Sequence, residues 1–168
     1  PDKIPPLRPA LAKDGTITAA TSSSISDGAA AVVLTRESVA EKNGQTPVAR
    51  IVAMAAHAQA PSEFTVAPVG AINKVLENAG WSADDVELWE VNEAFACVAM
   101  FAMRDIGIPH DKINVNGGGT ALGHPIGASG TRIIVTLLNA LKEQGKKRGI
   151  ASLCIGGGEA TAVAVELV

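Results

Sequence analysis

Aromatic residues are scarce in this sequence of 168 residues: they make up 3% of it, and tyrosine is absent. The core must therefore be built from alanine, valine, isoleucine and leucine, and hydrophobic residues make up 47% of the chain. The 17 glycines allow close backbone approaches between layers of such small side chains. A chain this apolar is not expected to be disordered, and its length suits one domain with one core.

Long runs of basic residues are also missing, and the net charge is −3. A nucleic-acid partner is therefore not expected, because such a partner requires a cluster or stripe of Lys and Arg. No apolar stretch reaches the roughly 18 to 20 residues of a bilayer span, and no basic stretch followed by an apolar one opens the chain. We expect a soluble protein with no export signal and no membrane partner.

Cysteine and histidine are rare as well. The two cysteines, Cys97 and Cys154, are too few for a disulfide framework, so free thiols are expected. No two of the three histidines have the spacing of metal ligands, and no metal site is expected.

The chain opens irregularly, without a methionine. Four prolines within the first nine residues exclude regular structure and predict an extended lead-in over residues 1–13. This opening suggests a processed or truncated chain.

Hydrophobic periodicity predicts alternating helices and strands. Helices are expected over residues 38–43, 68–80, 92–104 and 133–145. Strands are expected over residues 29–35, 48–58, 86–91, 113–115, 148–155 and 161–168, the last two antiparallel. A capping arrangement is expected at Ser82 and Asp85. Together these elements predict one α/β domain with a mixed β-sheet.

Three clusters place polar side chains where strands are expected to end. They are NEAF at residues 92–95, GGGTALGHPIGASG at residues 117–130 and CIGGG at residues 154–158. The ends of strands that lead into loops are where α/β folds bind ligands. The glycine-rich loop is not a phosphate-binding loop of the Walker type, because no Lys-Ser/Thr pair follows it.

His124 and Cys154 are the candidate reactive side chains of these clusters. A rigidly held imidazole can take a proton from a thiol or donate a hydrogen bond to an oxyanion. A thiol beside glycine N–H groups can act as an acid or a base. The alternatives are a turn with a surface histidine and a cysteine that only fills the core.

The NEAF cluster leaves several interpretations open. Asn92 is expected to open the following helix, where its amide either caps the helix or holds a water. Glu93 is either an acid that favours the helix dipole in the first turn or a group that orients a neighbour, and a structural role is favoured. Cys97 is interpreted as a small buried hydrophobe.

In order and spacing, the three clusters resemble the C-terminal signatures of the thiolase family, NEAF, GGGxALGHPxGASG and CxGGG. The resemblance extends to LRPALAKDGTITA near the start and to SDGAAAVVL after it, so it covers nearly the whole chain. It implies that residues 1–168 form a thiolase-like C-terminal domain with helices on both faces of the sheet. It also implies that an N-terminal domain with the nucleophile and a loop domain lie outside this chain.

The resemblance implies an acyltransferase, most similar to acetyl-CoA C-acetyltransferases. Such enzymes condense two acetyl-CoA molecules to acetoacetyl-CoA and CoA, or run the reverse thiolytic cleavage. CoA thioesters are then the substrates, and no other cofactor is implied.

The resemblance also assigns roles to residues of the three clusters. His124 would activate the acyl-accepting cysteine and help to form the first oxyanion hole, and Asn92 would hold the water that completes this hole. Cys154 would exchange the α-proton of the substrate, and the N–H of Gly156 would contribute to the second oxyanion hole.

Two further residues are assigned by resemblance. Ser23 would touch the pantetheine arm of CoA, and Phe64 would lie near the acyl end of the pocket. The family segment NASGIND reads TSSSISD here, so a glycine and two asparagines are replaced. Because the acyl-accepting cysteine would lie outside this chain, residues 1–168 alone are expected to show no thiolase turnover.

Two alternatives stay open: a longer-chain 3-ketoacyl-CoA thiolase, and a non-enzymatic module that serves folding or assembly. A decarboxylating condensing enzyme ranks lower, since it would carry a second histidine in place of Asn92. The expected partners are an acyl-CoA, the N-terminal thiolase domain and further copies of the full-length chain. A bacterial cytoplasm is the expected location, with a mitochondrion as the alternative.

Overall fold

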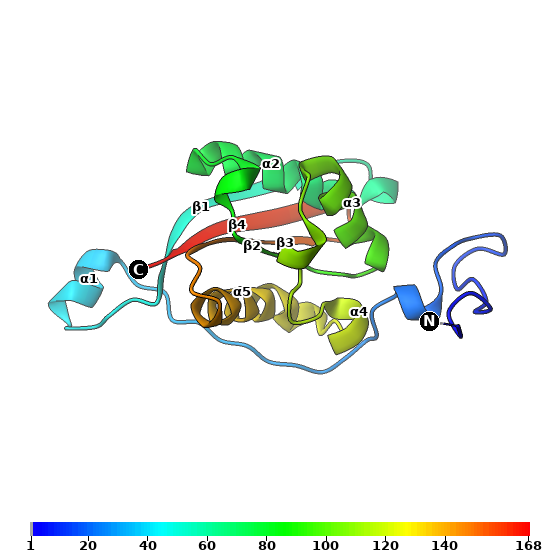
Figure 1. Cartoon of the computed structure of the whole chain (residues 1–168), viewed down its shortest axis with the longest axis horizontal. Coiled ribbons are helices and arrows are strands. Elements are labelled where there is room, and N and C mark those ends of the chain that lie inside the picture. The colour runs from blue at the N-terminus through cyan, green and yellow to red at the C-terminus, as the bar shows by residue number, and fades with distance from the viewer. Residues whose placement is uncertain (1) are drawn as a thin grey trace.

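The computed structural model describes residues 2–168, which divide into two parts (Figure 1). The layered unit, residues 49–168, holds one β-sheet with helices above and below it. The N-terminal stretch, residues 2–48, runs along the outside of this unit as mostly irregular chain. Within the predicted lead-in, residues 2–13 form turns and bends and no helix or strand.

The sheet has four strands in the order β1-β4-β3-β2. The strands are β1 (Ala49–Ala58), β2 (Leu88–Val91), β3 (Arg148–Cys154) and β4 (Glu159–Leu167). β4 pairs antiparallel with both β1 and β3, whereas β2 pairs parallel with β3. The predicted mixed sheet is therefore confirmed, as is the antiparallel pairing of the last two strands.

The hairpin between β3 and β4 depends on one glycine. Gly158 has φ +102°, and a Cβ atom there would collide with the backbone of residues 59–61. Only glycine adopts this conformation without strain while letting the neighbouring backbone approach so closely. The turn thus fixes the position of the chain just beyond Cys154.

Helices cover both faces of the sheet, as the resemblance implied. In Figure 1, α2 (Ala67–Ala79) and α3 (Ala96–Ile106) lie above it, while α4 (Gly119–Leu122) and α5 (Ile126–Glu143) lie below. The remaining helices are α1 (Glu37–Lys42) and the 3-10 turns η1 (Ala19–Thr21), η2 (Pro61–Glu63), η3 (Ala83–Asp85) and η4 (His110–Lys112). No helix among residues 2–168 is both long enough and apolar enough to cross a membrane.

Small apolar side chains fill the space on each side of the sheet. Between the sheet and the upper helices, Ile72, Trp89 and Ile150 are fully buried. On the other side, Leu88 packs with Ile133, Leu137 and Leu141 of α5. Successive residues of β2 thus face opposite layers, as the alternation of a strand requires.

Several predicted helix ends are confirmed. α2 ends at Gly80, which has φ +66° and accepts the left-handed conformation of a helix C-cap. At η3, Ser82 donates both its N–H and its hydroxyl to Asp85 Oδ2, at 2.8 and 2.7 Å, as the capping pattern predicted.

Other predictions are wrong. Residues 29–35 form no strand: Val33 is 93% exposed, and none of the described residues pairs with this segment. Residues 113–115 contribute only a single bridge, between Ile113 and Trp89. The last long helix begins at Ile126 instead of residue 133, so the second half of the glycine-rich loop is helical.

Candidate active site

The candidate site lies where β2 and β3 end side by side. Because these strands are parallel neighbours, their C-terminal ends lie at the same edge of the sheet. The N–H of Asn92 donates to Ser152 O at 2.9 Å, and Cys154 follows two residues later at the end of β3. The NEAF and CIGGG clusters therefore start from adjacent points.

Asn92 does not open a helix. α3 begins four residues later, at Ala96, and its N-cap is Phe95, so the predicted capping role of Asn92 is wrong. The Asn92 side chain is buried, and its Nδ2 lies 3.3 Å from His124 Nε2. Its Oδ1 is buried too and has no hydrogen-bond partner among residues 2–168. This oxygen is an acceptor that the described residues leave unused.

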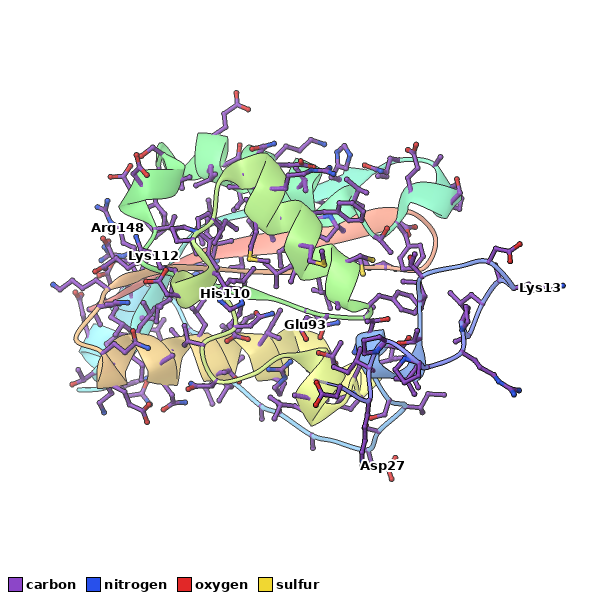
Figure 2. The ribbon with its side chains drawn as sticks, turned by 45° about the vertical axis from the view of Figure 1, so that its right-hand side comes forward. Lys13, Asp27, Glu93, His110, Lys112 and Arg148 are labelled. Carbon is purple, nitrogen blue, oxygen red and sulfur yellow. The ribbon has the colours of Figure 1, made fainter. Side chains whose placement is uncertain are left out.

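Glu93 ties the glycine-rich loop to the end of β2. Its carboxylate accepts hydrogen bonds from Asn114 Nδ2 at 2.9 Å, from Thr120 N at 3.2 Å and from the Thr120 hydroxyl. Gly118 lies directly against this carboxylate, where a Cβ atom would overlap with it. In Figure 2, Glu93 lies between α3 and the helices below the sheet. Of the two roles left open for Glu93, the acid in a first helical turn is wrong, since α3 begins at Ala96, and these contacts fit a group that orients its neighbours.

His124 lies in the link between α4 and α5, and two contacts fix its ring. Nε2 faces the Asn92 amide, and Nδ1 lies 2.6 Å from the hydroxyl of Ser129 in the first turn of α5. Burial lowers the pKa of His124, and the nearby positive charge of Arg132 lowers it further. A neutral imidazole of this kind is able to accept a proton at neutral pH.

The main chain of His124 is held by the N-terminal stretch. The His124 N–H donates to Ser24 O at 3.0 Å, and residues 25 and 124 form a parallel bridge. His124 is thus held from both parts of the molecule.

Cys154 is buried at the end of β3, with 7% of its surface exposed. Burial raises the pKa of its thiol to about 11, and neighbouring Cys97 adds to the rise, while a backbone hydrogen bond opposes it. The thiol is therefore protonated at neutral pH. In this state Cys154 is a proton donor, and its basic form is reached only when another group removes that proton.

Gly156 follows in the turn and is exposed. The hydrogen bonds of this turn come from the N–H groups of Ile155 and Gly158, and no acceptor among residues 2–168 binds the N–H of Gly156. That donor is available to an oxyanion beside Cys154.

Ser23 and Phe64 both lie against the NEAF cluster. Ser23 donates its N–H and its hydroxyl to Ala94 O, at 3.1 and 3.0 Å. The ring of Phe64 meets the ring of Phe95 edge to face, with centroids 6.2 Å apart. Their predicted contacts with CoA and with the acyl group stay predictions.

Two polar residues of this region, Ser129 and Glu90, were not predicted from the sequence. Ser129 belongs to the GASG end of the glycine-rich motif, five residues after His124, and is fully buried. Glu90 precedes Asn92 by two residues, is 1% exposed, and has one oxygen 3.6 Å from Arg132 Nη1. Burial raises the pKa of Glu90 to about 7, although Arg132 opposes the rise.

The second cysteine, Cys97, and another histidine, His57, lie outside this group of residues. Cys97 is half-buried, and burial raises the pKa of its thiol, which fits the interpretation of a small packed side chain. His57 Nε2 lies 3.1 Å from Gln59 Oε1 on the opposite edge strand. Across the part of the chain that the structure describes, no group of three His, Cys, Asp or Glu side chains could hold a metal ion.

Two family descriptions match the sequence. Residues 45–167 match "Thiolase, C-terminal domain", and residues 1–38 match "Thiolase, N-terminal domain". These matches divide the chain between residues 38 and 45, whereas the resemblance placed the whole of residues 1–168 in the C-terminal domain, and that assignment stays a prediction.

Individual relatives are similar over nearly the whole chain. A probable acetyl-CoA acetyltransferase of Dictyostelium discoideum is 50% identical over 165 residues, which is 98% of this chain and 40% of the relative. The crystal structure of the Bacillus anthracis acetyl-CoA acetyltransferase superposes with a TM-score of 0.96 at 42% identity, over 99% of this chain and 42% of that one.

A second solved structure was determined with CoA. The human mitochondrial 3-ketoacyl-CoA thiolase in complex with CoA has a TM-score of 0.92 at 39% identity, and the match covers 99% of this chain and 42% of that one. The chain thus spans about two fifths of the length of the proteins that it matches.

Proposed function

Because the chain belongs to the thiolase family, we propose that it supplies the acid, the base and part of the oxyanion-binding groups of an acyltransferase that acts on CoA thioesters. The reaction is acetyl-CoA plus acetyl-CoA to acetoacetyl-CoA plus CoA, and its thiolytic reverse. The observation that carries this proposal is the contact of His124 with Asn92 beside the end of β3, where Cys154 begins its turn.

The protonation states of the two reactive side chains support opposite roles. The pKa of His124 is lowered and that of Cys154 is raised, in both cases chiefly by burial. Environments that push two pKa values apart assign one group as the base and the other as the acid. His124 is therefore the base of the resting site, and Cys154 is the acid.

A neutral His124 and a protonated Cys154 are the states from which the cleavage of acetoacetyl-CoA starts. His124 Nε2 takes the proton of the acyl-accepting thiol, which the resemblance assigns to a cysteine outside residues 1–168. That sulfur attacks the keto carbon of acetoacetyl-CoA, the C–C bond breaks, and the departing enolate takes the thiol proton of Cys154. The products of this half-reaction are acetyl-CoA and an acetylated enzyme, which CoA then deacylates.

Two polar atoms without hydrogen-bond partners support the binding of substrate oxygen atoms that become negatively charged during the reaction. The N–H of Gly156 donates to no acceptor among residues 2–168, and Gly156 lies in the exposed turn that follows Cys154. Asn92 Oδ1 is buried without a partner among the same residues, and it provides an acceptor for a water beside His124. A water held there is able to donate to an oxyanion.

Ser23 is proposed to contact the pantetheine arm of CoA, and Phe64 the acyl group. The Ser23 hydroxyl already donates to Ala94 O, so its oxygen is left to accept a hydrogen bond from an amide N–H of the pantetheine arm. Phe64 and Phe95 form an apolar wall beside the loop that carries Asn92. A cytoplasmic location and a homo-oligomeric full-length protein are proposed with this activity.

The test is cleavage of acetoacetyl-CoA by the full encoded protein in the presence of CoA. We expect His124→Ala and Cys154→Ala each to lower kcat by about 10²- to 10⁴-fold, the usual contribution of general acid–base groups. Cys97→Ala is the matched control for the thiol and His110→Asn for the imidazole, and both are expected to keep activity. An inactive wild type, or a fully active Cys154→Ala variant, would contradict the proposal.

Substrate length is tested on the same protein. A preference for acetoacetyl-CoA over longer 3-ketoacyl-CoA chains is expected from the similarity to acetyl-CoA acetyltransferases. Faster cleavage of the longer chains would favour the alternative of a 3-ketoacyl-CoA thiolase. Calorimetry with CoA addresses the remaining alternative, since a folding or assembly module would not bind CoA.

A further inference from the structure

Ser129 makes the closest contact of the His124 ring. Its side chain is fully buried in the first turn of α5, and its Oγ lies 2.6 Å from His124 Nδ1. A serine hydroxyl is able either to donate to a ring nitrogen or to accept from one. The direction of this hydrogen bond decides which ring nitrogen of His124 carries the proton.

The hydroxyl proton of Ser129 is already in use. Oγ donates to Pro125 O at 3.0 Å, and the N–H of Ser129 donates to the same carbonyl at 2.9 Å. This is the bond of a helical serine to the carbonyl four residues earlier. With its single proton directed to Pro125 O, the hydroxyl presents a lone pair to His124, and this arrangement is satisfied when Nδ1 carries a hydrogen.

The other side of the ring gives the same answer independently. The Asn92 Nδ2 group, 3.3 Å from His124 Nε2, is a donor only. With the amide in this orientation, Nε2 is the acceptor nitrogen of the neutral ring. Two contacts, from α5 and from the end of β2, are thus satisfied by the same tautomer.

We propose that Ser129 is a positioning residue that holds His124 in the Nδ1–H tautomer and leaves Nε2 as the only nitrogen that gains and loses a proton. When Nε2 takes a proton, the Nδ1–H bond to Ser129 persists unchanged, so the ring need not turn during the cycle. The arrangement is that of a base oriented by a third group, but this third group is a neutral hydroxyl instead of a carboxylate.

A neutral orienting group has a chemical consequence. A carboxylate at Nδ1 would favour the imidazolium, whereas the Ser129 hydroxyl fixes the ring without adding negative charge. The low pKa of His124 is kept, and the ring stays neutral and ready to accept a proton. The part of this inference that concerns catalysis rests on the proposed function, but the tautomer itself does not.

The test is the side-chain ¹⁵N spectrum of protein labelled at histidine, recorded at a pH where His124 is neutral. His124→Gln identifies the signals of this residue among those of the other histidines. The expected spectrum shows a protonated Nδ1 and an unprotonated Nε2. A protonated Nε2, with the Asn92 amide turned to accept from it, would overturn the proposal.

Two substitutions extend the test. Ser129→Ala is expected to move His124 toward a mixture of tautomers, and Ser129→Thr, which keeps the hydroxyl, is expected to retain Nδ1–H. Ser152→Ala is the matched control, because Ser152 is equally buried and donates to the carbonyl of Thr161 at 2.8 Å without contacting a histidine. An unchanged His124 spectrum in folded Ser129→Ala would also overturn the proposal. If Ser129→Ala does not fold, the wild-type spectrum decides alone.

Activity provides a separate readout. In an active protein, Ser129→Ala is expected to lower kcat by about 10- to 100-fold with little change in KM, because the base is misoriented while substrate contacts remain. Ser129→Thr should restore most of the rate. Failure to cleave acetoacetyl-CoA would count against the proposed function, whereas the tautomer spectrum tests Ser129 regardless of that result.

Discussion

The layered unit and the N-terminal stretch contain similar local sequences but differ in what their apolar side chains contact. In the layered unit, Ile72 and Leu137 are 0% and 1% exposed, whereas in the N-terminal stretch Ile25 and Val33 are 97% and 93% exposed. Residues 29–35 are as rich in alanine and valine as β4, yet only β4 is a strand. β4 has a partner on each side. A segment of favourable composition therefore forms a strand only where other strands complete its backbone hydrogen bonds.

The two parts meet at the candidate site. The contacts of residues 23 and 24 with Ala94 and His124 join the N-terminal stretch to the loops that carry the reactive groups. The difference in burial is therefore also a difference in role: one part supplies the stable frame, and the other supplies contacts around the site.

The largest expected effect is on the free energy of unfolding, when an aliphatic side chain is cut back to alanine in each of the two parts. Leu137→Ala removes a buried side chain between α5 and the sheet, and we expect the free energy of unfolding to fall by about 2–5 kcal/mol. Val33→Ala, the aliphatic control in the N-terminal stretch, is expected to change it by less than about 0.5 kcal/mol. Denaturant unfolding of both variants measures the difference, and equal losses would show that residues 29–35 are packed in solution.

The second prediction uses the pH dependence of stability. Glu90 has a pKa of about 7 in the folded protein against 4.5 in the unfolded chain, so the folded state holds the proton more tightly. The contribution of this proton to the free energy of unfolding is complete below about pH 4.5 and is lost as the pH rises through about 7. The total loss is on the order of 3 kcal/mol. Glu90→Gln removes this dependence.

We therefore expect Glu90→Gln to gain stability relative to the wild type between pH 4 and pH 8. Glu37→Gln is the exposed control in the N-terminal stretch, where the ion pair with Arg50 contributes less than about 1 kcal/mol. Urea titrations at the two pH values check both variants. A constant difference between Glu90→Gln and the wild type would contradict the assigned pKa.

The smallest expected effect compares two matched glycines. Gly80 and Gly44 have φ +66° and +63°, and neither has a neighbouring atom within 4 Å of an added Cβ. Alanine at either position costs about 1 kcal/mol of local backbone strain. Gly80→Ala should lower the global free energy of unfolding by that amount, because α2 is part of the core.

Gly44→Ala should lower it by less, because α1 buries only Ala40 and is able to unfold before the layered unit does. Hydrogen exchange distinguishes the two cases: faster exchange confined to residues 37–43 is expected for Gly44→Ala. Equal global losses for the two variants would mean that α1 unfolds together with the core.

The sequence predicted the fold best where one face of an element must be buried. The apolar spacing of α2 and α5 and the alternation of the C-terminal hairpin follow from that requirement, and so these elements were predicted. The absence of a strand at residues 29–35 could not be predicted, because a local sequence pattern does not show whether a segment has strands to pair with. The start of α3 was misplaced because Asn92 and Glu93 look like residues of a first helical turn while their side chains bind distant loops.

For the candidate site, the motifs indicated which residues matter but not how they act. The contact between Asn92 and His124 joins residues 32 positions apart and depends on how α4 and α5 fold back over β2. In the sequence, Ser129 cannot be told from any other serine in a helix. Only its distance to His124 in the folded chain distinguishes it. The high pKa of Cys154 comes from burial by segments that no local pattern brings together.

The parallel pairing of β2 with β3 also has a consequence for the order of folding. The β3–β4 hairpin closes within a few residues, whereas β2 reaches β3 only across a long connection, as in the bond from Lys147 N to Glu87 Oε2, 60 positions apart. Closing a long loop costs more chain entropy than closing a short one, so the hairpin is expected to form early and the parallel pair late. Asn92 and Cys154 follow directly from that late pair. The ends of β2 and β3 should therefore come together late in folding, and a slow-refolding variant would regain most secondary structure before Asn92 and Cys154 reach their final positions.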